Sequence, residues 1–284
     1  MGEFMIDMLV QPMNYAFMQR GLAASMIVGV VCAMIGCYVV LRSMAFLGDA
    51  LAHAILPGIA IAYLLGGNLL LGALIAAVAV AFGIAFFSRE GVIKEDTAIG
   101  ILFAAALSLG VALISSIRTY AVDLSHILFG NVLGVSPANL WLIGGLSAGV
   151  ILTILLLYRP FQVITFDPVL AKTLRLPADL LRNLMLILLA VTIVVSMQTV
   201  GISLVAAMLV TPSAAAFMLT RRLPTMMALS MVFGAVSSLI GLYLSYYLNI
   251  ASGASIVLTA TFIFLLAYAF APRRGVFSHL FNRH

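Results

Sequence analysis

The sequence predicts an all-α integral membrane protein in which one transmembrane domain, residues 1–284, fills the chain. The chain is 64% hydrophobic and only 8% charged. It also contains repeated runs of more than about eighteen residues with few or no charges, and a helix of that length crosses roughly 30 Å of hydrocarbon. The polar stretches between these runs are short, so a separate water-soluble domain is not expected.

Hydropathy divides the chain into nine candidate spanning helices. Their approximate bounds are residues 17–41, 46–65, 68–88, 97–117, 138–158, 182–199, 201–219, 225–248 and 253–271. The second and the seventh are the weakest, because both are short and contain a proline, Pro57 and Pro212. Proline removes a backbone donor and clashes with the preceding turn, so we expect a broken or re-entrant helix at each place. Eight complete spans are the alternative to nine.

The distribution of basic residues predicts the orientation. With the N-terminus outside and the C-terminus in the cytoplasm, twelve of the fourteen Lys and Arg side chains fall in cytoplasmic segments and two, Arg20 and Arg118, fall outside. Positive charge is concentrated in cytoplasmic loops of membrane proteins. The net charge of +5 therefore reports topology, and we expect the lipid bilayer rather than nucleic acid as its partner.

The stretch GDALAHAILPG, residues 48–58, holds the sole acidic residue and the sole histidine inside the predicted spans, Asp49 and His53. Residues four apart lie on one face of a helix. An ionisable group within a membrane usually lines a cavity, pairs with another group or marks a transport path. Three interpretations stay open: a two-ligand hold on a divalent cation, a proton relay, and a structural hydrogen bond.

Metal binding would suit Mn²⁺, Fe²⁺ or Zn²⁺, because carboxylate and imidazole are ligands that these ions accept and no thiolate pattern favours Cu⁺. Two neighbours of the pair favour a path. Gly48 lets neighbouring backbone approach closely. Pro57 removes a backbone donor and clashes with the preceding turn, which either frees carbonyl oxygens to face a cavity or is an ordinary kink of a membrane helix.

The predicted cytoplasmic loop at 159–181 differs from the other loops, because it is long and polar. Asp167 is placed to cap a short helix that starts at Pro168, and Leu170 and Leu174 would share a face before Pro177 ends it. This pattern is typical of a docking helix for a partner subunit, or of an interfacial helix on the membrane. The chain has no G-x-x-x-x-G-K-[ST] motif, so we do not expect it to hydrolyse ATP or to be an enzyme.

Four blocks in order carry a resemblance: CYVVLRSMAFLGDALAHAILPGIAIAYLLG, LFGNVLGVSPANLW, FDPVLAKTLRLPADLLRN and VGISLVAAMLVTPSAAAFMLTRR. With them the chain resembles, over nearly its whole length, the membrane permease subunit of the manganese/zinc/iron ABC transporter family. The resemblance implies a type II-like ABC importer permease in the bacterial plasma membrane. It also implies a second copy of the chain, a cytoplasmic ABC ATPase dimer and an extracytoplasmic metal-binding receptor as partners, with no permanently bound cofactor.

The resemblance also implies roles for particular residues. Asp49 and His53 match the Asp and His implicated in the family's metal path. Pro57 directly after HAIL favours the manganese/iron branch, so Mn²⁺ is the first expectation, then Fe²⁺ or Zn²⁺. The residues that match the ATPase-coupling loop are Phe166, Asp167, Pro168, Ala171, Leu174, Arg175, Leu176 and Pro177.

Two positions depart from the family's pattern. Asn131 stands where many relatives have an aspartate, and Arg175 stands where they usually have glycine. The end of the coupling helix is therefore expected to differ.

The expected function is that of a permease subunit of an ATP-driven importer of divalent transition-metal ions, with a path gated at Asp49 and His53. The alternative is a proton-coupled carrier that uses the same pair as a relay.

Overall fold

The computed structural model describes residues 10–88, 93–116 and 132–271, and within these ranges every regular element is helical. Eight helical passes in them are long and apolar enough to cross a membrane, which confirms the predicted class. They are α2 (Ala16–Leu41), α3 with α4 (Ala45–Ala54 and Leu56–Leu64), α5 (Leu69–Phe87), α6 (Glu95–Ser115), α8 (Pro137–Leu156), α11 (Ala178–Val200), α13 (Leu223–Leu248) and α14 (Ser252–Phe270). The ninth predicted segment is the shorter helix α12 (Ile202–Leu219).

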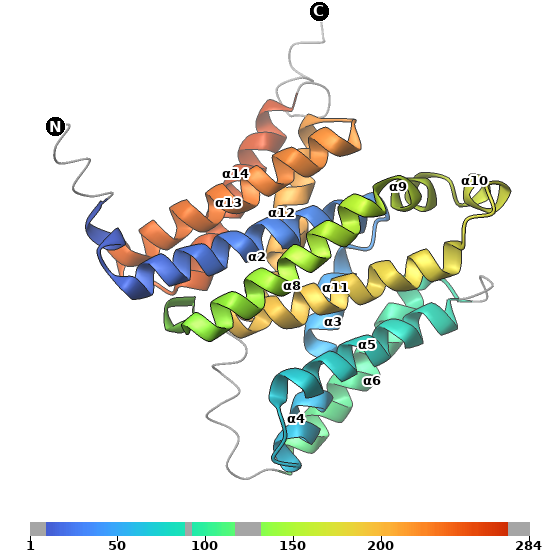
Figure 1. Cartoon of the computed structure of the whole chain (residues 1–284), viewed down its shortest axis with the longest axis horizontal. Coiled ribbons are helices and arrows are strands. Elements are labelled where there is room, and N and C mark those ends of the chain that lie inside the picture. The colour runs from blue at the N-terminus through green and yellow to red at the C-terminus, as the bar shows by residue number, and fades with distance from the viewer. Residues whose placement is uncertain (1–9, 89–92, 117–131, 272–284) are drawn as a thin grey trace, which may run out of the picture.

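Helix α2 is the centre of the larger helix group. It packs against α12 and α13, and on its other side against α8 and α11 (Figure 1). The crossing with α12 is very close, because a Cβ atom at Gly36 would overlap the carbonyl oxygen of Leu209. Lipid tails are as apolar as the helices, so membrane helices gain from close backbone approach at small residues. Gly36 therefore fixes α12 against the middle of the bundle.

A second group contains α3, α4, α5 and α6, and α11 contacts both groups. In Figure 1, α4, α5 and α6 lie on the opposite side of α11 from α13 and α14, and α3 passes behind α11. Gly58 of α4 and Gly72 of α5 cross without room for a Cβ on either residue. The second group is thus a tightly packed unit that joins the rest of the molecule through α3 and α11.

The two prolines expected to break their helices behave differently. The pass at residues 45–64 is interrupted at Ile55, and Pro57 is the second residue of α4, as predicted. By contrast, α12 stays helical through Pro212, so the predicted break there is wrong. A membrane helix tolerates an internal proline when neighbouring helices hold the segment in place. Here α12 packs against α2, α13 and α14.

The predicted cytoplasmic loop is more ordered than expected. A short helix, α9 (Tyr158–Phe166), follows α8 almost without interruption, and α10 (Pro168–Thr173) follows α9. Phe161 and Ile164 of α9 are buried. Phe161 packs edge-on against Tyr38 near the end of α2, with 5.8 Å between ring centroids. The segment is therefore anchored on the transmembrane bundle.

Candidate functional site

Helix α3 exposes Ala45 at its start and one stripe, formed by Phe46, Asp49 and His53, while its other residues are buried. The side chain of Asp49 is 43% exposed and that of His53 is 26% exposed in the single chain. The spacing of the three residues, i, i+3 and i+7, places them along one side of the helix. The pair predicted from the sequence is thus present and accessible on the protomer surface.

The two side chains of the pair point towards each other. His53 Nε2 and Asp49 Oδ1 are 3.6 Å apart. This separation exceeds that of a good hydrogen bond. Ligand atoms that share one Zn²⁺-sized ion each lie about 2.0–2.2 Å from it, so a gap below about 4 Å is compatible with a shared ion. The geometry therefore suits two ligands of one cation without rearrangement of the backbone.

Aromatic side chains enclose His53 on one side. Phe103 of α6 lies 6.1 Å from the imidazole ring, centroid to centroid, and Phe46 packs edge-on against Phe103 at 5.4 Å. Rings at these distances make favourable offset or edge contacts. Phe103 thus limits the rotation of His53, and the sequence analysis did not identify it because an aromatic residue in an apolar helix carries no distinguishing signal.

The back of α3 is held by the neighbouring helices. A Cβ atom at Gly48 would lie 3.0 Å from the Leu209 side chain of α12, so a neighbouring side chain packs closely there. At the break, Pro57 lacks the N–H that would bond to the His53 carbonyl in a continuous helix. Gly110 of α6 packs on this break, where an added Cβ would meet Leu56 Cβ at 2.8 Å. The pair is therefore carried on a short helix fixed at both ends.

The pair has few companions of metal-binding type. In the residues that the structure describes, no group of three or more His, Cys, Asp or Glu side chains could hold a metal ion. Asn131, at the position where the resemblance places a carboxylate in relatives, lies outside the described residues. An ion held by Asp49 and His53 needs further ligands from water, backbone carbonyls or another chain.

The expected docking segment, residues 159–181, begins its second helix as predicted. The Asp167 carboxylate accepts hydrogen bonds from the N–H groups of Val169 and Leu170, at 3.0 and 2.9 Å. Pro168 is the first residue of α10. These bonds satisfy backbone donors that a helix start leaves free.

Helix α10 ends earlier than expected, at Thr173 rather than just before Pro177. Arg175 has φ 53°, and the N–H of Leu176 bonds to the Ala171 carbonyl at 3.0 Å. This is the helix-ending motif in which glycine is the usual left-handed residue. The departure at Arg175 therefore changes the residue but keeps the turn.

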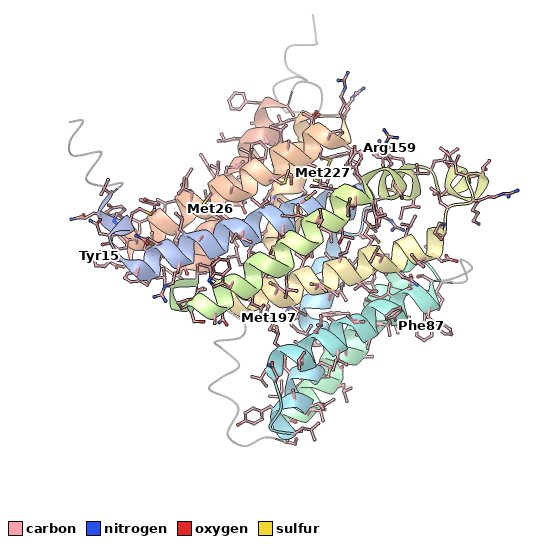
Figure 2. The ribbon with its side chains drawn as sticks, in the orientation of Figure 1. Tyr15, Met26, Phe87, Arg159, Met197 and Met227 are labelled. Atoms are coloured by element: carbon pink, nitrogen blue, oxygen red, sulfur yellow. The ribbon has the colours of Figure 1, made fainter. Side chains whose placement is uncertain are left out.

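An apolar face lies on this segment and is called the docking face below, after the role expected of the segment. It consists of four exposed side chains, with exposures of 44–74%: Phe166, Val169, Leu170 and Leu174. Ala171 lies underneath and is buried. Of these residues, Val169 and Leu170 were absent from the set matched by the resemblance, although Leu170 was expected on the same helix face as Leu174. Figure 2 shows Arg159 and Phe87 at one end of the molecule and Tyr15 at the other, so the docking segment lies at the predicted cytoplasmic end.

The comparisons with known proteins agree with this arrangement. The family model described as "ABC 3 transport family" matches residues 14–271. The chain belongs to this ABC transporter family. It is a multi-pass permease of the cell membrane, not an enzyme.

This ABC permease has relatives that match it along nearly their whole length. It is 48% identical over 266 residues to "Manganese transport system membrane protein MntC" of Halalkalibacterium halodurans, covering 94% of this chain and 91% of that protein. It is 39% identical over 270 residues to "Probable iron transport system membrane protein" of Haemophilus influenzae, covering 95% and 99%. It is also similar to a solved structure, "PsaBC from Streptococcus pneumoniae in complex with Fab", with a TM-score of 0.85, 36% identity and 97% and 99% coverage.

Proposed function

We propose that this permease carries divalent transition-metal ions into the cell in an ATP-driven importer, and that Asp49 and His53 hold each ion in passage. The observation that carries the proposal is the pair itself: two metal-ligating side chains, 3.6 Å apart, on the exposed stripe of α3. A sparse ligand set suits a transport site, because a conducting site must release what it binds.

The cargo is Mn²⁺ first, then Fe²⁺ or Zn²⁺. Relatives named for manganese and for iron transport support this order, and the more similar of the two named above is the manganese protein. A carboxylate and an imidazole accept all three ions. Preference among them therefore depends on the remaining ligands and on the extracytoplasmic receptor that delivers the ion.

A second copy of the chain covers the α3 stripe in this proposal. A carboxylate that is 43% exposed would face hydrocarbon in a lone protomer, and that is costly at membrane depth. Two protomers with their α3 stripes turned towards a common water-filled path would keep both carboxylates away from lipid. The homodimer thus follows from the exposure of Asp49 in a membrane helix.

A cytoplasmic ATPase dimer supplies the energy through the docking segment. Exposed apolar patches rimmed by polar residues mark protein interaction sites, and the docking face is such a patch on a segment anchored to α2. A receptor on the outer side releases the ion into the path. ATP-driven motion of the docking segment then opens the inner side.

The test is uptake of radioactive Mn²⁺ into proteoliposomes that contain the permease, its ATPase and its receptor. Asp49→Asn and His53→Gln should each lower uptake at least about tenfold, because each removes one of few ligands. Asp96→Asn, which changes an exposed carboxylate at the start of α6, outside the docking segment, is the control and should leave uptake unchanged. Normal uptake by correctly assembled Asp49 and His53 variants would disprove the site, and competition among Mn²⁺, Fe²⁺ and Zn²⁺ would rank the cargo.

The alternative is a proton-coupled carrier, which the same Asp–His geometry also suits. It predicts uptake by the permease alone, driven by a proton gradient. The importer predicts no uptake without the ATPase and ATP.

A further inference from the structure

Four helix ends meet around Glu95, the first residue of α6. Its Oε2 accepts a hydrogen bond from Arg42 Nη2 at 3.3 Å, and its Oε1 accepts one from Arg182 Nε at 3.1 Å. Arg182 also donates through Nη2 to Ser88, the residue that caps α5. One carboxylate thus joins the end of α2, the start of α6 and the second turn of α11, and Arg182 adds the end of α5.

This cluster is largely withdrawn from water. The side chains of Arg42, Glu95 and Arg182 are only 17–20% exposed. Burial lowers the pKa of Arg42, nearby Glu95 opposes this shift, and Arg182 adds to it. Two cations therefore depend on one anion, and ion pairs in such surroundings are stronger and more directional than pairs on the open surface.

Arg42 is connected stiffly to the ligand-bearing helix. It caps α2, and the next residue, Ser43, has φ 58°. The N–H groups of Ser43 and Met44 bond back to the carbonyls of Val40 and Val39, at 3.1 and 3.0 Å. Helix α3 then starts at Ala45 and carries the candidate metal ligands within its first nine residues. A displacement of Arg42 is therefore carried directly into α3.

Arg182 is connected just as closely to the docking segment. The turn after α10 is fixed by the bond from Leu176 N–H to the Ala171 carbonyl, and Ala178 N–H bonds to the Leu176 carbonyl at 2.8 Å. Helix α11 starts at Ala178, so Arg182 follows one turn later. A movement of the docking segment reaches Arg182 through a connection with no free loop.

We propose that Glu95 is a positioning residue that links the two movements, so that displacement of α11 by the docking segment shifts Arg42 and the root of α3. The inference rests on the proposed function, because it assigns Glu95 to the coupling of ATP hydrolysis to ion release at Asp49 and His53. Glu95 touches neither the ion nor the ATPase in this scheme. It acts through Arg42 and Arg182.

The experiment compares Glu95→Gln with the wild-type complex of permease, ATPase and receptor in proteoliposomes. ATP hydrolysis and Mn²⁺ uptake are measured on the same preparation. Because the link between the sites is lost while both sites remain, the number of ions carried per ATP should fall at least about fivefold. Asp96→Asn is the matched control: it is the adjacent exposed carboxylate in the same helical turn, and it should leave the ratio unchanged.

The double variant Glu95→Gln/Arg182→Gln distinguishes a purely structural role of Glu95 from its proposed role in coupling. This variant removes one of the two cations that Glu95 compensates, so it should assemble even if Glu95→Gln alone does not. The inference expects the double variant to remain uncoupled. A wild-type ratio of ions to ATP in Glu95→Gln, or in the double variant, would overturn it.

A second readout is independent of the cargo. A nitroxide label on exposed Ala45, at the start of α3, reports the distance between the two α3 helices of the complex. ATP should change this distance in the wild type and not in Glu95→Gln. A wild-type complex that shows the change but carries no metal ion would overturn the proposed cargo and leave the Glu95 link standing, whereas an equal change in both proteins would overturn the link.

Discussion

Arg175 adopts a left-handed backbone conformation, φ 53°, at the end of α10. A side chain in this conformation costs roughly 1–2 kcal/mol, and glycine offsets part of the gain through its freedom in the unfolded chain. Arg175→Gly should therefore stabilise the turn by roughly 0.5–1 kcal/mol. Hydrogen exchange of the peptide at 167–177 should slow about two- to fivefold, while Lys172→Gly, inside α10, should accelerate it. Faster exchange in Arg175→Gly would contradict the prediction.

Single residues differ in how much the sequence revealed about them. Asp49 and His53 were predicted correctly as neighbours, because a spacing of four residues determines proximity on a helix. The contacts of Glu95 with Arg42 and Arg182 join residues 53 and 87 positions apart. No local spacing reports such contacts, although all three lie at predicted cytoplasmic ends of spans. The contact of Phe103 with His53 could not be predicted either, since it depends on how α6 packs on α3.

At the scale of elements, the docking face predicts how the ATPase binds. Leu170 is 44% exposed on α10, so Leu170→Asp should leave the permease folded. It places a charge in an apolar contact, and loss of a central contact of this kind costs about 2 kcal/mol or more. The ATPase recovered with tagged permease should fall by more than about tenfold. Leu170→Met keeps the apolar area and should retain the ATPase; equal recovery with both variants would exclude this face as the docking site.

The helices themselves were largely predictable from the sequence, and their interior contacts were not. Each of the nine predicted segments is helical, because the length of an apolar run reflects the thickness of the membrane. Their buried faces could not be assigned, since lipid and protein interior are both apolar and leave no amphipathic period. The same limit explains why the sequence could not show which of the two prolines interrupts its helix. Only packing distinguishes Pro57, at the break where Gly110 contacts α4, from Pro212 inside a continuous α12. Helix α9 was missed because it has only nine residues and Arg159, Pro160 and Gln162 interrupt its apolar residues.

At the scale of the whole molecule, charge determines orientation. Figure 2 shows Phe87 and Arg159 at one end of the molecule and Tyr15 at the opposite end. Hydrogen bonds join Glu95 to Arg42 and Arg182, and Arg182 to Ser88, the neighbour of Phe87, so this cluster lies at the same end as Phe87. Moving basic groups across the bilayer is unfavourable, so the end with most of them should face the cytoplasm. This orientation places the docking face where ATP is available.

The orientation can be measured with single cysteines and a membrane-impermeant maleimide in intact cells. Leu65→Cys lies at the predicted outer end of α4, where Leu65 is 79% exposed, and should be labelled without permeabilisation. Lys172→Cys, on exposed α10, should be labelled only after the membrane is opened. The native Cys32 and Cys37 are fully buried and should give little background. Labelling of Lys172→Cys, but not Leu65→Cys, in intact cells would invert the topology. The docking face would then lie outside the cell, where no cytoplasmic ATPase could reach it.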